Sequence, residues 1–233
     1  MTDHSAEFAT SLDLPTLFVI ATWMAALLGL FLFLAWINDR ATRALAWWST
    51  AYIFGGSSIA LWGAFREASP AFLAEIPSTL LFLSAGMIWT GARLFHSRSV
   101  RPLALSAGAL VWLVASQFAA LGPGSSARLI LSSLIISAYT FLTAGELWQE
   151  RRARSFPRWQ IRLMPVLHAA VFLAPVVLPA LMPRKLDQAG ASQLLVVLTI
   201  ETLLYAVGTA FLILALVHER RIRSIRMRHP PMR

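Results

Sequence analysis

Residues 15–37 read PTLFVIATWMAALLGLFLFLAWI and contain no charged side chain. A helix needs about 20 apolar residues to cross the hydrocarbon core of a bilayer, so this stretch is long enough. Pro15 suits the first turn of such a helix, where its missing N–H costs no intrahelical bond. The stretch therefore predicts a transmembrane helix.

Six further apolar stretches follow this one. They cover about 46–65, 76–95, 103–121, 129–148, 161–182 and 192–217. Seven spans use roughly 140 residues, which fits a chain of 233 residues. Short connections favour antiparallel neighbours. We therefore predict an all-α, polytopic seven-transmembrane-helix bundle over 15–217, with an outer tail over 1–14 and a basic tail or linker helix over 218–233.

The composition excludes several classes of protein. The chain is 58% hydrophobic, 13% charged and free of cysteine, whereas a soluble domain is about 25% charged. A soluble globular domain, a disordered chain and a disulfide scaffold are all incompatible with these values. The first fifteen residues contain no Lys or Arg, so we expect no cleavable signal peptide.

The basic residues predict the orientation of the bundle, because Lys and Arg concentrate in cytoplasmic loops. With seven spans, 16 of the 20 basic residues fall on one side, together with the C-terminus. The other side has Arg66, Arg128, Arg184 and Lys185. We therefore expect the N-terminus outside and the C-terminus in the cytoplasm. The positive charge then faces anionic lipid headgroups, at about 1 kcal/mol per residue near the surface, and predicts no nucleic-acid partner.

Two ionisable residues lie inside predicted spans, where such residues are costly and need a partner or a use. Glu201 is in the seventh stretch and His168 in the sixth. Counted from the cytoplasmic helix ends at about 1.5 Å per residue, His168 lies at about 12 Å and Glu201 at about 24 Å. This gap predicts two parts of one polar column and no direct hydrogen bond between the two side chains.

We expect a pocket around Glu201, in the outer half of the bundle and open to the extracytoplasmic side. Pro175 and Pro179 free backbone carbonyls at that depth. The candidate ligand-binding or switch residues are Glu201, His168, Tyr205, Thr202, Ser133 and Ser137. The alternative for Glu201 is a purely structural carboxyl, kept protonated by desolvation or hydrogen-bonded to a neighbouring helix.

Several other activities find little support in the residues. Retinal needs a lysine within a span, and the only lysine, Lys185, falls in an outer loop. Haem through His168 is an alternative, but haem b would normally want a second axial ligand at a matching depth. No phosphate-binding loop, metalloprotease helix or nucleophile elbow appears. We therefore expect no catalytic residue, no metal site and no cofactor.

Small residues predict close helix contacts. Gly56, Ala60 and Ala64 repeat at four-residue spacing in the second stretch, as do Ala25 and Gly29 in the first. Such ladders let backbones approach closely, and here packing within the bundle is favoured over a dimer seam. The seventh stretch is expected to continue as a helix through His218 to Arg226, until Pro230-Pro231 stops it.

A diffuse set of motifs resembles the membrane-embedded N-terminal sensory region of bacterial GGDEF-type diguanylate cyclases. The matching stretches are 47–61, 89–95 with Arg98, 146–148 with Arg151 and Arg152, 167–170, 200–205 and 217–220. The resemblance implies an input module of the bacterial inner membrane, with a homodimer and an unknown small-molecule or membrane signal. Within these residues we expect no cyclase domain, since the only Gly-Gly pair, Gly55-Gly56, lies inside a predicted span and Arg233 stands where that domain would begin.

Two classes of function therefore remain. The first is a sensory module that relays a signal through the seventh helix to a cytoplasmic output domain. The second is a small transporter or proton-coupled carrier that uses Glu201, although the inverted repeats typical of transporters are not apparent. A haem-binding membrane protein through His168 is a third and weaker alternative.

Overall fold

The computed structural model describes residues 14–64, 73–122, 125–148, 158–181 and 188–228, and these contain helices and no strand. The α-helices are α1 (Leu14–Asn38), α2 (Arg43–Ala64), α3 (Ile76–Phe95), α4 (Pro102–Ala115), α5 (Ser126–Leu147), α6 (Arg158–Phe172), α7 (Ala174–Leu181) and α8 (Gln188–Arg228). Two short 3-10 turns, η1 (Leu73–Glu75) and η2 (Ala119–Leu121), complete the set. The predicted all-helical class is confirmed.

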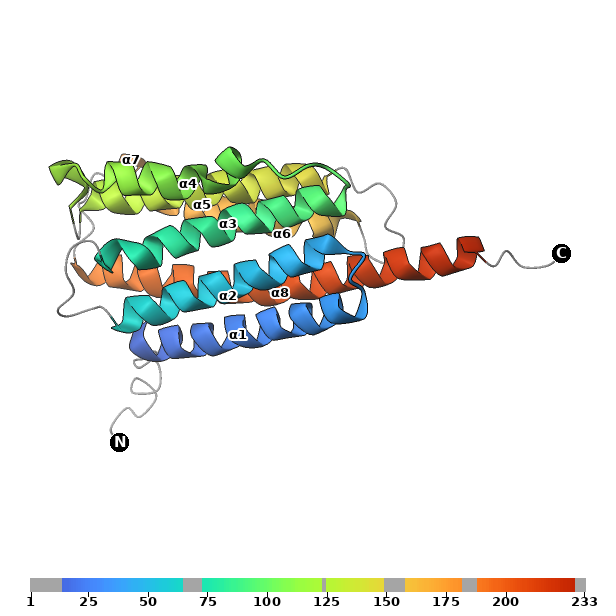
Figure 1. The fold of residues 1–233 in the computed structure, drawn as a ribbon. Coiled ribbons are helices and arrows are strands. Elements are labelled where there is room, and N and C mark those ends of the chain that lie inside the picture. The colour runs from blue at the N-terminus through green and yellow to red at the C-terminus, as the bar shows by residue number, and fades with distance from the viewer. Residues whose placement is uncertain (1–13, 65–72, 123–124, 149–157, 182–187, 229–233) are drawn as a thin grey trace, which may run out of the picture.

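The helices lie side by side along one common direction, and α8 extends past the end of the others (Figure 1). Helix α1 packs on α2 and α8, α2 on α3, α3 on α5, α5 on α6, and α6 on α8. Helix α4 packs on α3, on the face of the bundle opposite α1 (Figure 1). The end at which α1, α3 and α5 finish and α2, α4 and α6 begin is called the basic end below, because Arg40, Arg43, Arg98 and Arg101 lie there.

Four helical segments of the described chain are long and apolar enough to cross a membrane. They are Pro15–Asn38, Leu73–Phe95, Ser126–Leu147 and Leu194–Ile222, and shorter apolar helices cover Pro102–Ala115 and Leu163–Val177. The chain is thus a membrane protein with apolar helices suited to a lipid bilayer. The finer expectation of seven spans, with its orientation, stays a prediction.

The predicted stretches and the observed helices differ in two places. The fourth stretch ends as a helix at Ala115 and continues through a turn into η2. The sixth stretch divides into α6 and α7, because Pro175 has no N–H to continue the ladder and instead occupies the first turn of α7. The expected extension of the last helix into the basic tail is confirmed, since α8 reaches Arg228. Pro230 and Pro231 lie outside the described residues.

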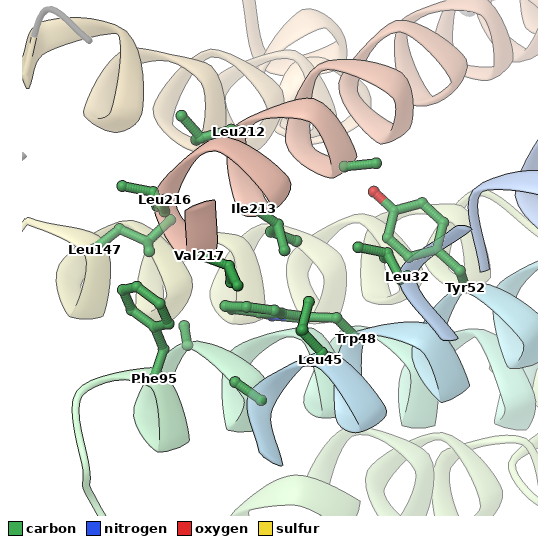
Figure 2. Close-up of a cluster of buried hydrophobic side chains, with 13 residues drawn as sticks. Leu32, Leu45, Trp48, Tyr52, Phe95, Leu147, Leu212, Ile213, Leu216 and Val217 are labelled. Atoms are coloured by element: carbon green, nitrogen blue, oxygen red, sulfur yellow. The ribbon is translucent and has the colours of Figure 1, made fainter. Parts of the chain in front are cut away.

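The largest hydrophobic core lies at the basic end and joins α8 to α1, α2, α3 and α5 (Figure 2). The indole of Trp48 lies between Leu45, Ile213 and Val217 in Figure 2, and its Nε1 donates to the carbonyl of Ile88, 3.0 Å away. Leu147 of α5 closes the same cluster. This core holds α8 in place at the level where it leaves the bundle.

Part of the small-residue ladders serves α1–α2 packing: Ala25, Gly29 and Gly56 lie at this contact, whereas Ala60 and Ala64 are exposed. A methyl group added at Gly56 would lie 3.0 Å from Cβ of Ala25, and one added at Gly29 would lie 3.2 Å from Cγ1 of Ile53. The hydroxyl of Ser49 also donates to the carbonyl of Gly29 across the contact, at 2.9 Å. Close approach of the two backbones therefore depends on these positions staying small.

Candidate functional site

His168 and Glu201 form a direct contact between α6 and α8. Nδ1 of His168 lies 2.6 Å from Oε2 of Glu201. The histidine is 4% exposed, whereas the Glu201 side chain is 22% exposed. The pair is an ion pair if the imidazole is protonated and a hydrogen bond otherwise. Either way, one proton is shared between an imidazole and a carboxyl group inside an apolar helical bundle.

Aromatic rings cover the imidazole. The Tyr205 ring stacks on His168, with the ring centroids 3.9 Å apart and the planes at 10°. Phe172 packs at 4.7 Å and 47°. Glu201 and Tyr205 are four residues apart and so share one face of α8. The same helix therefore supplies both a hydrogen-bond partner and a stacking partner to the histidine, and any movement of α8 changes both contacts.

The expectation that His168 and Glu201 are too far apart to bond was wrong. That expectation assumed that Gln160 and Val217 lie at the same depth, whereas in the structure their depths differ. Val217 belongs to the core at the basic end, whereas Met164 lies against Gly208. Helices α6 and α8 run antiparallel, so one turn before Met164 in α6 corresponds to one turn after Gly208 in α8. Gln160 therefore lies near Leu212, roughly 8 Å deeper in the bundle than Val217. Helix α6 therefore begins deeper than assumed, and this offset brings His168 to Glu201.

The remaining candidate residues differ in their relation to the pair. The Ser137 hydroxyl donates to the carbonyl of Ala169 at 3.1 Å and so links α5 to the residue after His168. Thr202 donates to Leu198 of its own helix at 2.7 Å. Ser133 is buried in α5. The structure thus brings together His168, Glu201 and Tyr205, and Ser137 is bonded to the residue after His168. The described residues show no hydrogen bond from Thr202 or Ser133 to the pair.

The predicted outer pocket around Glu201 stays a prediction. A shallow groove that the structure does show lies elsewhere, between α1 and α2, with a volume of about 270 Å³. The described residues contain no group of three His, Asp or Glu side chains that could hold a metal ion. For haem, His96 and His218 belong to the basic end, so neither supplies a second axial histidine at the depth of His168.

A second polar cluster, which the sequence did not predict, ties α3 to α5 at the basic end. Glu146 of α5 is buried and accepts from Arg93 at 3.0 Å and from Arg98 at 2.9 Å. The Arg93 Nε also donates to the carbonyl of Ser99, at 3.1 Å. The available signal was a carboxylate near the end of the stretch 129–148, with arginines near and just after the end of the stretch 76–95.

The α3–α4 corner presents one of these arginines through a Schellman-type cap. The N–H of Ser97 donates to the carbonyl of Leu94 and the N–H of Arg98 to that of Arg93, both at 2.9 Å. Ser97 has a φ of 59°, in the left-handed region where glycine is favoured. This strained corner directs Arg98 towards Glu146.

Helix α8 is bonded to the same corner. Nη1 of Arg220 lies 2.8 Å from the carbonyl oxygen of Phe95, and the guanidinium lies 5.2 Å from the centre of the Phe95 ring. The carbonyls in the last turn of a helix lack intrahelical partners and carry partial negative charge. Arg220 therefore caps α3 at the position where α8 leaves the bundle.

The opposite end of the bundle has its own clamp. Arg128 of α5 pairs with Glu75 at 2.7 Å, and the indole N–H of Trp112 donates to the same carboxylate oxygen at 2.8 Å. The Arg128 guanidinium lies 4.6 Å from the centre of the Trp112 ring. These contacts join η1, α4 and α5 and satisfy the charges locally, so the cluster is a structural clamp.

No family model matches this chain, and no curated protein or solved structure is significantly similar to it. The resemblance to the sensory region of diguanylate cyclases therefore stays a prediction. The features that point to a function are the His168–Glu201 pair and helix α8, which carries Glu201.

Proposed function

We propose that this chain is a membrane-embedded sensory or input module that relays a signal along α8 to a cytoplasmic output domain of the diguanylate-cyclase type. The observation that carries the proposal is the continuity of α8. One helix without an interior proline runs from Gln188 to Arg228 and includes Glu201 inside the bundle and a basic extension outside it. A change at Glu201 has a direct mechanical route to the output end.

The switch in this proposal is the contact of His168 with Glu201 and Tyr205. A signal can shift α8 only if it binds the two positions of the helix with different affinity. A small polar molecule or a proton that competes for the imidazole or the carboxylate meets this condition, because it removes a contact that only one position makes. The signal itself is a small molecule or a state of the membrane.

The proposed setting is a bacterial inner membrane, with seven spans and the basic end in the cytoplasm. The distribution of charge supports this orientation. Arg40, Arg43, Arg98 and Arg101 lie at the basic end, within reach of anionic lipid headgroups. At the opposite end, the described residues offer Arg128, whose charge is paired with Glu75. In this orientation the α8 extension points into the cytoplasm.

A proton-coupled carrier or small transporter that uses Glu201 is the second candidate. The observation in its favour is the imidazole–carboxylate pair within apolar helices, since ionisable groups at such positions often lie on proton paths. The two candidates differ in what they require of α8. A sensor needs the extension to move, whereas a carrier needs a route for a solute across the bilayer.

The deciding experiment joins the chain after Arg233 to a cyclase reporter that is active only as a dimer. We expect Glu201→Gln and His168→Asn to change the reporter output in the same direction, with no further change in the double variant. Thr202→Val is the matched control, because its hydroxyl bonds only within its own helix. Unchanged output in both single variants, with loss of a proton flux in proteoliposomes, would favour the carrier and reject the sensor.

A further inference from the structure

The break between α6 and α7 leaves backbone carbonyl groups without their helical partners. The carbonyl of Val171 loses its partner because Pro175 has no N–H. The carbonyl of Phe172 loses its partner because the N–H of Val176 donates instead to the carbonyl of Leu173, at 3.0 Å. Carbonyls at the end of a helix also carry partial negative charge. Inside an apolar bundle, such oxygens need a partner from elsewhere.

The break lies at the depth of Glu201. Helices α6 and α8 run antiparallel, with Met164 against Gly208. Phe172 follows Met164 by two helical turns, and Ile200 precedes Gly208 by the same two turns. Both positions are therefore about 12 Å from the Met164–Gly208 contact. The free carbonyls of α6 and the carboxyl group of α8 share one level of the bundle.

The carboxyl group of Glu201 has one oxygen atom that is not engaged. Its Oε2 lies 2.6 Å from Nδ1 of His168, whereas its Oε1 forms no hydrogen bond within the described residues. Phe172, whose carbonyl is one of the two at the break, packs on the same His168 ring at 4.7 Å. The Glu201 side chain is 22% exposed, so an ion can reach it without unfolding of the bundle.

Helix α5 contributes a hydroxyl group at this level. Ser137 donates to the carbonyl of Ala169, and α5 and α6 run in opposite directions (Figure 1). Ser133, one turn before Ser137, therefore lies level with Leu173 at the break. Helix α5 packs on both α6 and α7, and Ser133 is buried there. Its hydroxyl oxygen is a further acceptor at the depth of the two carbonyls.

We infer that one monovalent cation, such as Na⁺, binds between the break and Glu201. Its ligands are the two carbonyls at the break, Oε1 of Glu201 and the Ser133 hydroxyl. Oxygen ligands suit hard cations, and unwound carbonyls of broken membrane helices coordinate Na⁺ in transporters. One carboxylate balances one positive charge, whereas a divalent ion leaves a costly net charge among apolar helices. As a signal acting on the Glu201 switch, the ion rests on the proposed function.

Binding is measured with radiolabelled Na⁺ on the purified full chain in detergent, with choline replacing Na⁺ at constant ionic strength. We expect saturable binding to the unmodified chain. Glu201→Gln removes the charged ligand and should weaken binding at least about tenfold. Asp39→Asn is the matched control and should leave the affinity unchanged. It removes the same charge from the α1–α2 turn, where the carboxylate accepts from Thr42 at 2.7 Å.

Pro175→Ala tests the break itself. The N–H that it introduces can donate to the Val171 carbonyl, as in an unbroken helix, and so competes with the ion for this oxygen. We expect binding about fivefold weaker. Pro165→Ala is the control, because Pro165 is also buried and lies inside α6, away from the break. Equal affinity in the two proline variants would overturn the inference.

Two further results would overturn it. A lack of saturable binding to the unmodified chain would leave water as the partner of the carbonyls, and equal binding in Glu201→Gln and Asp39→Asn would place the ion elsewhere. The assay is independent of the cyclase reporter. Saturable binding that Glu201→Gln weakens, with a reporter output that Na⁺ does not change, would uphold the ion site and reject the relay. A reporter that responds to Glu201→Gln without Na⁺ binding would do the reverse.

Discussion

The guanidinium of Arg220 donates to the carbonyl oxygen of Phe95 at 2.8 Å, so the helix that leaves the bundle is bonded to the end of one that stays within it. Phe95 is at the same time part of the core around Trp48, with the two ring centroids 5.8 Å apart. A side chain at the exit point of α8 is thus fixed to a rigid part of the molecule. The bond defines the position at which the extension becomes independent of the bundle.

Arg220→Gln should loosen α8 from this point. The substitution removes a charged donor from a helix C-terminus, which costs about 1 kcal/mol. We expect backbone hydrogen exchange in residues 213–228 to become faster in detergent, measured by mass spectrometry. Arg220→Lys retains the positive charge at the helix end and should show a smaller increase. Exchange rates equal to the unmodified chain in Arg220→Gln would show that the core alone holds α8.

The His168–Glu201 contact should appear as a coupling energy. In a double-mutant cycle with His168→Asn and Glu201→Gln, we expect about 1 kcal/mol of coupling, as for hydrogen bonds between helices in membranes. Unfolding of the chain in mixed micelles by increasing detergent provides the free energies. The control cycle pairs His168→Asn with Thr202→Val and should give a value near zero. Equal couplings in the two cycles would contradict a specific contact.

Ser97→Gly should stabilise the protein. A left-handed conformation costs a residue with a Cβ about 1 kcal/mol, and glycine avoids this cost. Thermal unfolding should shift upwards for Ser97→Gly and should not do so for Ser99→Gly, since Ser97 is the only non-glycine residue with positive φ in the described chain. An increase of the same size in both variants would assign the effect to the loop in general.

Gly86→Ala should separate α3 from α4. A Cβ atom at this position would collide with the backbone carbonyl of Leu105, and backbone atoms cannot move aside as a side-chain end can. We expect a loss of about 1–3 kcal/mol in unfolding free energy. Gly63→Ala is the matched substitution, because a Cβ there meets no atom within 4 Å. A similar loss in both variants would exclude crowding at α4 as the cause.

The helices were predictable from the sequence wherever an apolar stretch was bounded by clear polar residues. The stretch 76–95 coincides with α3 to the residue. One prediction failed because a proline acted inside an apolar stretch. Both sides of Pro175 are apolar, so hydropathy showed one long segment, whereas the missing N–H divides the segment into α6 and α7.

The candidate site was predicted in its members and missed in its geometry. Glu201 and His168 stood out because ionisable residues are rare in apolar helices. Their contact depends on the relative depth of α6 and α8, which loop positions do not define. The Arg93–Glu146–Arg98 cluster was missed for a related reason. Helix ends carry many charges, and only the folded chain shows that Glu146 is buried between two arginines.

The position of Arg220 on α8 determines which movements of the helix can reach its tip. With Arg220 as a fulcrum, the inner arm back to Glu201 is about 28 Å long and the outer arm to Arg228 about 12 Å. A sideways displacement at Glu201 is therefore reduced by a factor of about two at the tip. A rotation about the helix axis suffers no such reduction. This geometry transmits a rotation of α8 about its axis better than a tilt of α8. Spin labels or crosslinks that detect rotation of the extension are therefore the sensitive probes of its motion.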